Sequence, residues 1–401
     1  MTDPRYCGGC FGNCGSNALC VASSCRAASA AWTPLPDTGG TVALHGVGHD
    51  LASDGARLFL AVVSRDNGGL VGVNVAHYAP ALSTWSSVGP TIAPALDVKQ
   101  SAALFATPTE LYLAYGSAST IHVTSSQDLA NWSELAPPGL ASPCVMYWAM
   151  DLLVAAGVPH VAGLGSGGCG IGVMVASAPS GLWLTPGGPT VTMNGNGAPA
   201  LVATDRVYVA VAERTPSLPS IETWSARYFS PTPTPGAWLT LDGSLSTITN
   251  SGAMSGPDGT GMALVADRGQ NLFVAWAEPV DATTMRVRVA THGSGAAAWA
   301  EVGVAPATGG QNARAPSLAL IGDNLWLSHL VAESGVEHVQ VRMFDRRNSA
   351  WMAVGGNLDA SATDSAVMPG IVGVGGVPYV VFRQGPAATT GTAIVVVRFT
   401  N

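Results

Sequence analysis

The chain has 401 residues and a formal net charge of −8, with 10 % charged residues and a single lysine among its 17 basic residues. This acidic balance excludes a nucleic-acid interface, which needs a stripe of Lys and Arg to neutralise phosphates. The mean hydropathy is +0.30, but no run of about 18 apolar residues is free of Gly, Pro or polar residues, so we expect no transmembrane helix.

Residues 1–28 form a cysteine-rich segment that differs from the rest of the chain. The segment has few apolar residues and cannot bury a core, so we expect disulfides to stabilise it, in a pairing that the spacing leaves open. A zinc site is the alternative for its C-x2-C pair, but no second matching pair follows. The cysteines are Cys7, Cys10, Cys14, Cys20 and Cys25.

The text of this segment, DPRYCGGCFGNC, resembles the cysteine-rich segments common in secreted proteins and lipoproteins of myxobacteria. The pattern has Asn where this chain has Tyr6, and the resemblance covers about 25 residues. It implies an extracellular or cell-surface address and no activity. The odd number of cysteines suggests a precursor whose signal peptide has been removed and which could have carried a lipid anchor.

Seven tryptophans recur through the chain at steps of 47 to 61 residues, in similar texts such as TWSSVG and AWAEVG. A second repeated segment, such as RLFLAVV or NLFVAWA, places a large residue two positions before a small one and has the pattern of a β-strand. One apolar segment precedes it and another follows it, so each unit has four strands, which we name a to d, with the tryptophan on d. The tryptophans are Trp32, Trp85, Trp132, Trp183, Trp238, Trp299 and Trp351.

The two ends of this repeat are out of phase. Trp32 has no a, b or c strand before it, whereas the last unit has these three strands and reaches Asn401 without a tryptophan. We therefore predict an all-β fold, a seven-bladed β-propeller over residues 29–401 that an N-terminal outer strand closes. An open β-solenoid would need capping repeats, and none is visible. The predicted blades are 38–89, 90–136, 137–187, 188–242, 243–303, 304–355, and 356–401 with 29–37.

Two further cysteines lie in the third predicted blade. Cys144 begins its strand a and Cys169 lies in its b–c turn, and these points share one end of an up-and-down sheet. We expect a disulfide between them, worth roughly 3 kcal/mol through chain entropy. Two buried free thiols are the alternative. A disulfide would agree with an oxidising compartment.

The d–a connections and b–c turns of such a propeller share one face around the mouth of the central channel, where loops can bind ligands. Four acidic residues lie just past strand b in different blades. They form either a ring that coordinates a cation or accepts hydrogen bonds from sugar hydroxyls, or a set of solvated loop carboxylates. These candidates are Asp66, Glu213, Glu278 and Glu333.

His45 and His49 in LHGVGHD are the most suggestive ionisable pair, with Asp50 beside them. From the first strand a both could face the channel and bind a divalent metal at its mouth, given further ligands from other blades. His329, just after the small residue of a strand b, is a third candidate ligand. His160 occupies the aromatic position of strand b, and we expect it to pack in the core. No other cofactor is indicated.

No motif of a hydrolase, zinc protease, P-loop protein or kinase occurs. The segment SSQDLANW resembles the S-x-D-L-x-x-W hairpin of glycoside-hydrolase propellers and, less closely, the Asp-box of sialidases. This resemblance implies a structural c–d turn capped by Asp128, and the sialidase arginines, tyrosine and acid match no positions here. Texts such as NLFVAWAE also resemble the kelch-like and lectin-like repeats of secreted bacterial propellers, which implies a fold and not an activity.

The sequence thus predicts a secreted or cell-surface, monomeric propeller that binds a surface protein, polymer or glycan. Loops that differ from blade to blade favour one site, on the face of the d–a and b–c loops. One alternative is a metal-dependent hydrolase or lyase that uses the same face. A second alternative is a lectin, which would have several sugar sites between blades with exposed aromatic residues.

Overall fold

The fold is that of a computed structural model. It describes residues 18–21, 24–27, 31–36, 46–66, 69–92, 98–117, 120–135, 149–165, 172–178, 198–215, 218–230, 237–241, 247–248, 261–281, 284–303, 312–346, 348–359, 363–385 and 393–400.

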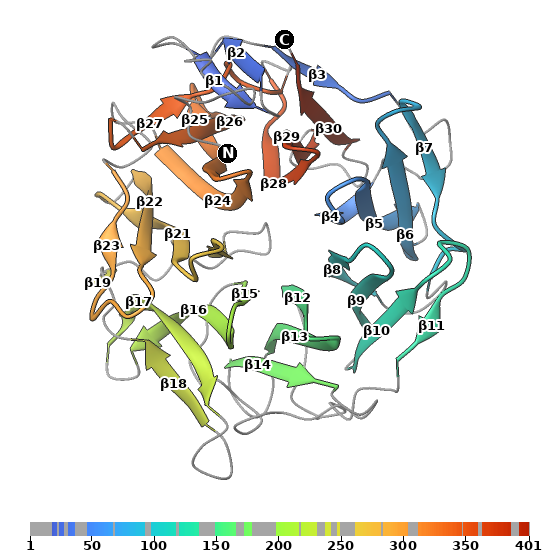
Figure 1. Cartoon of the computed structure of the whole chain (residues 1–401), viewed down its shortest axis with the longest axis horizontal. Helices are drawn as coiled ribbons and strands as arrows, with labels where there is room; N and C mark the ends of the chain where they lie inside the picture. The colour runs from blue at the N-terminus through green and yellow to red at the C-terminus, as the bar shows by residue number, and fades with distance from the viewer. Residues whose placement is uncertain are drawn as a thin grey trace.

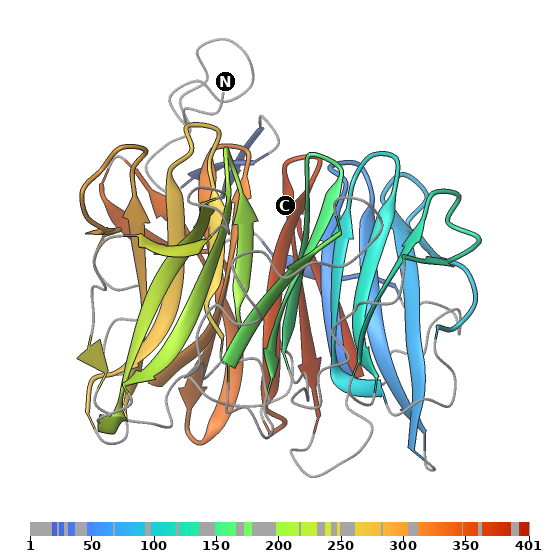
Figure 2. The same ribbon diagram turned by 90° about the horizontal axis from the view of Figure 1, so that it is seen from below.

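Seven antiparallel sheets stand around a common axis as the blades of a propeller (Figure 1). Within each sheet the first strand lies nearest the axis and the later strands lie further out. In side view the strands run between two faces of the molecule, where the turns gather (Figure 2). The described residues contain strands and no helix, so none of them forms a helix long and apolar enough to cross a membrane. The predicted seven-bladed all-β fold is confirmed.

The first blade consists of β4 (Gly46–Ser53), β5 (Leu58–Asp66), β6 (Gly69–Ala79) and β7 (Thr84–Ser87). The second consists of β8 (Val98–Ala106), β9 (Leu111–Ser117), β10 (Thr120–Ser126) and β11 (Ser133–Glu134). The third has, among its described residues, β12 (Met150–Ala155), β13 (Val158–Gly165) and β14 (Gly172–Ser177). The fourth consists of β15 (Ala200–Ala203), β16 (Val207–Thr215), β17 (Leu218–Ser230) and β18 (Ala237–Leu241), with β19 (Thr247–Ile248) beside β17.

The fifth blade consists of β20 (Ala263–Ala266), β21 (Leu272–Pro279), β22 (Met285–His292) and β23 (Ala300–Glu301). The sixth consists of β24 (Asn312–Ile321), β25 (Asn324–Glu333), β26 (Val336–Asp345) and β27 (Ala350–Ala353). The seventh consists of β28 (Ala366–Val374), β29 (Val377–Gln384), β30 (Ala393–Phe399) and β3 (Trp32–Pro34).

The seventh blade joins the two ends of the propeller. Its outer strand β3 pairs antiparallel with β30, and Trp32 faces Phe399 in the register. The hydroxyls of Thr33 and Thr400 lie 2.7 Å apart across this junction. The predicted closure by an N-terminal outer strand is therefore confirmed, and β3 covers the outer edge of β30 at these residues.

Most cysteines lie outside the described residues. The exceptions are Cys20 and Cys25, which face each other in the hairpin of β1 (Ala18–Val21) and β2 (Ser24–Ala27). The disulfide between Cys144 and Cys169 remains a prediction, because both residues lie outside the described part of the chain, as do Cys7, Cys10 and Cys14.

The hydrophobic core lies between the blades. Between the first two blades, Phe59 and Ala61 of β5 pack in one cluster with Leu111 and Leu113 of β9. Ala61 is fully buried, and it is one of the small residues that follow the repeated large residue of strand b. A small side chain at this position lets neighbouring sheets approach, because packed sheets must interdigitate without voids.

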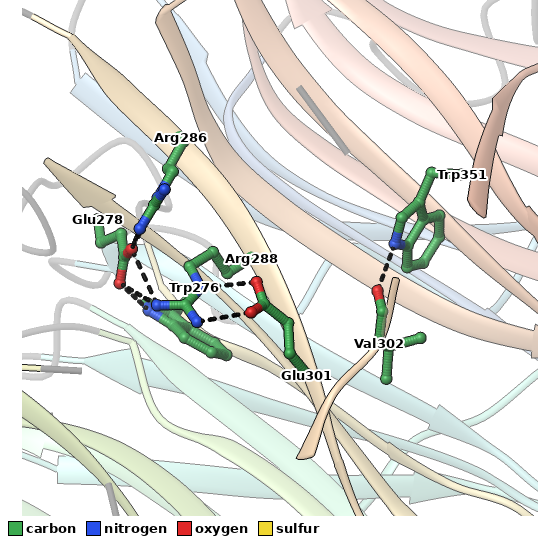
Figure 3. Close-up of polar contacts among 7 residues, drawn as sticks. All are labelled: Trp276, Glu278, Arg286, Arg288, Glu301, Val302 and Trp351. Carbon is green, nitrogen blue, oxygen red and sulfur yellow. Dashed lines mark hydrogen bonds and ion pairs between the residues drawn. The ribbon is translucent and has the colours of Figure 1, made fainter. Parts of the chain in front are cut away.

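The repeated tryptophans join neighbouring blades at the outer rim. In four of them the indole N–H donates to a backbone carbonyl at the end of strand d of the preceding blade, as Figure 3 shows for Trp351 and Val302. The bonds are Trp32 to Val354 (2.9 Å), Trp85 to Pro36 (3.1 Å), Trp132 to Val88 (3.0 Å) and Trp351 to Val302 (2.8 Å). In three of them the acceptor is a valine three residues after a tryptophan. Three of the seven repeats, those of Trp85, Trp299 and Trp351, have a valine at this position, and its carbonyl accepts the indole of the following blade.

Candidate functional site

Glu278 is the most deeply buried of the predicted site carboxylates whose side chains are described, with 5 % of its surface exposed. It lies near the end of β21 and accepts hydrogen bonds from Arg286 at 2.8 Å, Arg288 at 3.1 Å and the indole N–H of Trp276 at 3.2 Å (Figure 3). Arg288 also holds Glu301 through two bonds of 3.0 and 2.9 Å. Donors from β21 and β22 engage both oxygens of Glu278, and Arg288 extends this network to Glu301 in β23.

Glu213 and Glu333 are also engaged within their own blades. Glu213 at the end of β16 forms an ion pair with Arg227 of β17. Glu333 at the end of β25 accepts hydrogen bonds from the amides of Gln340 at 3.3 Å and Asn357 at 3.2 Å. The backbone of Asp66 lies at the end of β5, opposite Gly69. All four acids lie within the last residues of b strands and not just past them. Those with described side chains make contacts in three different blades, so their role as a ligand-binding ring stays a prediction.

The candidate metal ligands are spread over the molecule. His45 lies outside the described residues. His49 in β4 is 7 % exposed, and its Nε2 lies 2.8 Å from the carbonyl oxygen of Met368 in the seventh blade. Burial is the main cause that lowers the pKa of His49 to about 4. In the part of the chain that the structure describes, no three His, Cys, Asp or Glu side chains gather to hold a metal ion.

His329 lies on β25 inside the contact between the fifth and sixth blades. It is fully buried, and neither ring nitrogen has a hydrogen-bond partner among the described residues. Burial, together with the nearby Arg342 guanidinium, lowers the pKa of His329 to about 3. His49 and His329 therefore lie in two different contacts between blades, and a metal site that contains both stays a prediction.

Sequence reasoning named Asp50 only as a neighbour of His45 and His49, and it missed that Asp50 and Asp151 form a pair on the innermost strands. Asp50 in β4 lies opposite Ala61, and Asp151 in β12 lies opposite Ala162. Both alanines are the small residue of strand b, so the two acids occupy the same position of the repeat. The other blades have small residues at this position, namely Ala103, Ala200, Ala263, Ser317 and Gly370. The signal in the sequence was an acid in two blades at a repeat position where the other blades have a small residue. It becomes visible only when the a strands of all blades are aligned by the b-strand residues that face them.

Asp50 joins the first blade to the second. Its Oδ1 accepts a hydrogen bond from the N–H of Leu51 at 2.8 Å, and its Oδ2 accepts one from the N–H of Leu104 in β8 at 2.6 Å. The innermost strand of each blade is a sheet edge, whose N–H groups on the axis side have no strand partner. The carboxylate satisfies two of these groups, which would otherwise carry the cost of an unpaired backbone donor.

Asp151 repeats this arrangement between the third and fourth blades. It accepts hydrogen bonds from the N–H of Leu152 at 2.8 Å and of Leu201 in β15 at 2.5 Å. Ser317 occupies the same repeat position in the sixth blade, and its hydroxyl accepts a bond of 3.3 Å from the N–H of Ile371 in the seventh. An inner set of bonds therefore links blades near the axis, as the tryptophans link them at the rim.

The two acids also share an electrostatic environment. Both are partly exposed but closely surrounded by protein. Burial raises the pKa of Asp50 to about 7, and the charge of Asp151 adds to the shift. Burial likewise raises the pKa of Asp151 to about 6. Both raised pKa values lie close to neutral pH, so each carboxyl can accept hydrogen bonds when ionised and donate one when protonated.

The comparisons with known proteins concern the fold. No protein-family model matches the chain, and no curated protein sequence matches it. Among solved structures, an ulvan lyase from a new family of polysaccharide lyases, bound to an oligosaccharide of glucuronic acid and sulfated rhamnose, has a TM-score of 0.54 and 8 % identity, covering 91 % of this chain and 95 % of that chain. A second polysaccharide lyase has a TM-score of 0.54 and 8 % identity, covering 100 % and 95 %.

A lectin from Aleuria aurantia, in complex with a fucosyl N-acetylglucosamine, is similar more loosely. Its TM-score is 0.44 at 10 % identity, covering 74 % of this chain and 94 % of that chain. At 8 % identity the likeness to the two lyases shows the fold alone.

Proposed function

We propose that the protein is a glycan-binding propeller whose ligand lies at the axis against Asp50 and Asp151. The carrying observation is the pair itself, two partly exposed acids on inner strands with pKa values raised to about 7 and about 6. Perturbed acids of this kind gather at functional sites. The two polysaccharide lyases with the same fold support a polymeric sugar as the ligand.

The ligand is expected to be neutral and rich in hydroxyl groups. A carboxylate accepts hydrogen bonds from sugar hydroxyls, and a protonated carboxyl donates one back. The formal net charge of −8, together with two acids at the site, would repel a polyanion. The anionic oligosaccharide bound to one of the two lyases is therefore not the expected ligand, and the lyases support only a polymeric sugar. The proposed class is therefore a neutral polysaccharide or a neutral glycan on a surface protein.

A hydrolase or lyase that uses the same two acids is the second candidate. One ionised and one partly protonated carboxyl are the groups that general acid–base cleavage of a glycosidic bond needs. The metal-dependent form of this candidate rests on His45 and His49 and on ligands from other blades. Its signature would be a metal that the purified protein retains and that the double variant His45→Ala, His49→Ala loses.

The test compares binding and cleavage in matched variants. The wild type is titrated into a panel of neutral and acidic polysaccharides by affinity electrophoresis, and the same mixtures are assayed for new reducing ends and for unsaturated products. Asp50→Asn and Asp151→Asn should each weaken binding about tenfold or more, as expected for hydrogen bonds to a charged group. Ser317→Ala is the control, because it removes an inner bond between blades at the same repeat position without removing a carboxyl.

The outcomes separate the candidates. Binding without new chain ends supports a binding protein, whereas new ends that disappear in Asp50→Asn and Asp151→Asn support an enzyme. Equal loss of binding in Ser317→Ala would assign the acids to blade packing alone. No binding of any panel member by the wild type would end the proposal.

We further propose a secreted or cell-surface, monomeric protein with a disulfide between Cys144 and Cys169. Residues 1–28, rich in cysteine, support this address, because disulfides persist in oxidising compartments. In the protein made in an oxidising host and denatured, thiol alkylation followed by peptide mass mapping should leave Cys144 and Cys169 unlabelled, and light scattering should give the mass of one chain.

A further inference from the structure

Three hollows lie on the face opposite the b–c turns, each between two neighbouring blades. All three are lined by a–b turns, and they lie between the first and second, third and fourth, and fifth and sixth blades. Their volumes are about 210, 240 and 470 Å³. Each of these three cavities lies between two neighbouring blades, on the other side of the molecule from the predicted binding loops.

The hollow between the third and fourth blades combines aromatic walls with a charged rim. Phe229 of β17 and Trp238 of β18 form one wall, with ring centroids 5.7 Å apart. His160 of β13, in the neighbouring third blade, also lines the hollow. Asp205 and Arg206 of the a–b turn lie at its edge, with 45 % and 48 % of their side chains exposed.

The rim residues are held in place by their neighbours. Asp205 accepts hydrogen bonds from the hydroxyl of Thr204 at 2.8 Å and that of Tyr208 at 3.3 Å. The Arg206 guanidinium lies over the ring of Tyr228, 4.8 Å from its centroid, and 3.4 Å from Asp205. Fixed polar groups beside an apolar wall are the usual composition of a small-ligand pocket.

Neither of the other two hollows has both a wall of two aromatic rings and a charged rim. The hollow between the fifth and sixth blades is rimmed by charges, including Asp267, Arg268 and Asp323, and no aromatic side chain lines it. The hollow between the first and second blades has an arginine, a glutamate and one aromatic residue, Phe59. Of the three, the hollow between the third and fourth blades alone has two aromatic rings beside a carboxylate and a guanidinium.

We propose that the hollow of His160, Asp205, Arg206, Phe229 and Trp238 binds a single sugar ring. The apolar C–H face of a pyranose packs on the aromatic wall, and its hydroxyls donate to Asp205 and accept from Arg206. The pocket is a second site, on the face opposite the b–c turns and independent of the acids at the axis. It shares only the ligand class of the proposed function.

The test uses methyl glycosides of glucose, galactose, mannose, fucose and N-acetylglucosamine as probes. Binding is followed by saturation-transfer NMR and by the tryptophan fluorescence of the whole chain. At least one probe should saturate, and Asp205→Asn should weaken its affinity about tenfold, the usual cost of losing a hydrogen bond to a charged group. The double variant Asp50→Asn, Asp151→Asn should keep this affinity, which separates the pocket from the axis site.

Asp323→Asn in the hollow of the fifth and sixth blades is the matched control and should leave binding unchanged. Arg206→Ala is a second variant at an exposed position and should lose binding together with Asp205→Asn. The proposal is overturned if no probe saturates the wild type. It is equally overturned if binding survives in Asp205→Asn and Arg206→Ala, since the sugar would then lie elsewhere.

Discussion

Gly89 shows how one residue serves the contact between two blades. It follows Val88, whose carbonyl accepts the indole N–H of Trp132, and its φ of +63° lies in the left-handed region. A Cβ at this position would lie 2.7 Å from Cδ1 of that indole. We expect Gly89→Ala to lower the free energy of unfolding by about 3 kcal/mol, through backbone strain and the displaced ring. Denaturant unfolding measures the loss.

Gly55→Ala is the matched control for this prediction. Gly55 has a φ of +91°, and no atom lies within 4 Å of the place of a Cβ. Gly55→Ala should therefore lower the free energy of unfolding only through backbone strain, by about 1–2 kcal/mol. Equal losses in the two variants would show that Trp132 leaves room for a methyl group beside Gly89.

His329 should make the protein sensitive to acid. Burial lowers its pKa in the folded state to about 3 from an ordinary value of 6.5, so the unfolded chain binds a proton that the folded chain refuses. The contribution of neutral His329 to the free energy of unfolding is fully present above pH 6.5 and is lost as the pH drops from about 6.5 towards 3. We expect His329→Leu to reduce this slope and to raise stability, because it replaces a buried ring without hydrogen-bond partners by an apolar side chain.

The measurement is the unfolding midpoint at several pH values, compared between the variant and the wild type. His122→Gln is the control for loss of a histidine as such, since this ring pairs with Glu134 near the surface. An unchanged slope in His329→Leu would place the acid sensitivity elsewhere. A loss of bound metal in His329→Leu would instead support the predicted metal site.

At the scale of the strand, Glu278 and Glu213 form a natural comparison. Both lie near the end of a strand b, but Glu278 is 6 % exposed and holds two arginines, whereas Glu213 is 18 % exposed and holds one. Removing one partner of a buried ion pair leaves the other charge uncompensated. We expect Glu278→Gln to cost about 3 kcal/mol, the low end for a buried pair because Arg286 is 43 % exposed.

Glu213→Gln should cost clearly less, about 1 kcal/mol. Thermal unfolding of both variants provides the comparison, and polysaccharide binding is measured in parallel. Loss of binding in Glu278→Gln without loss of stability would favour the original prediction of a ligand carboxylate over the role in the sheet.

The strand scale also shows what sequence could and could not predict about the site. Glu278 was predicted just past strand b and lies one residue before its end, and its partners come from the register, which sets Arg286 directly opposite. Asp50 and Asp151 have no motif around them, and their raised pKa depends on burial that neighbouring blades create. The hollow of Trp238 needs two blades at once. Contacts within one strand are visible in sequence, whereas contacts between blades appear only in the assembled molecule.

At the scale of the whole molecule the seven-bladed propeller and its closure were predicted from sequence, whereas Trp183 and the expected d strand of the third blade lie outside the described residues. The period of the tryptophans reflects a physical bond, since four of them donate across to the preceding blade. The phase difference at the ends reflects the pairing of β3 with β30. The tryptophan signal is visible in the sequence because it recurs, and the phase difference is visible because it involves both ends of the chain. The acids at the axis occur in only two blades and give no such signal.

Removing the closing strand should open the propeller. Deletion of residues 1–28 keeps β3 and should leave the melting temperature close to that of the intact chain. Deletion of residues 1–36 removes β3 and exposes the edge of β30, so we expect a lower melting temperature and self-association through that edge. Differential scanning calorimetry and light scattering distinguish the two. Similar behaviour of both truncated chains would mean that closure by β3 adds nothing to stability.

The pairing of β3 with β30 also sets an order of events during synthesis. Six blades are built from contiguous stretches of chain, and each can fold soon after it leaves the ribosome. Residues 32–34 are made early but find their partners only when residues 397–399 have emerged. A nascent chain therefore carries an unpaired strand through nearly the whole of translation. An arrested chain that lacks β30 would keep that strand free, a mark by which chaperones could distinguish unfinished molecules from finished ones.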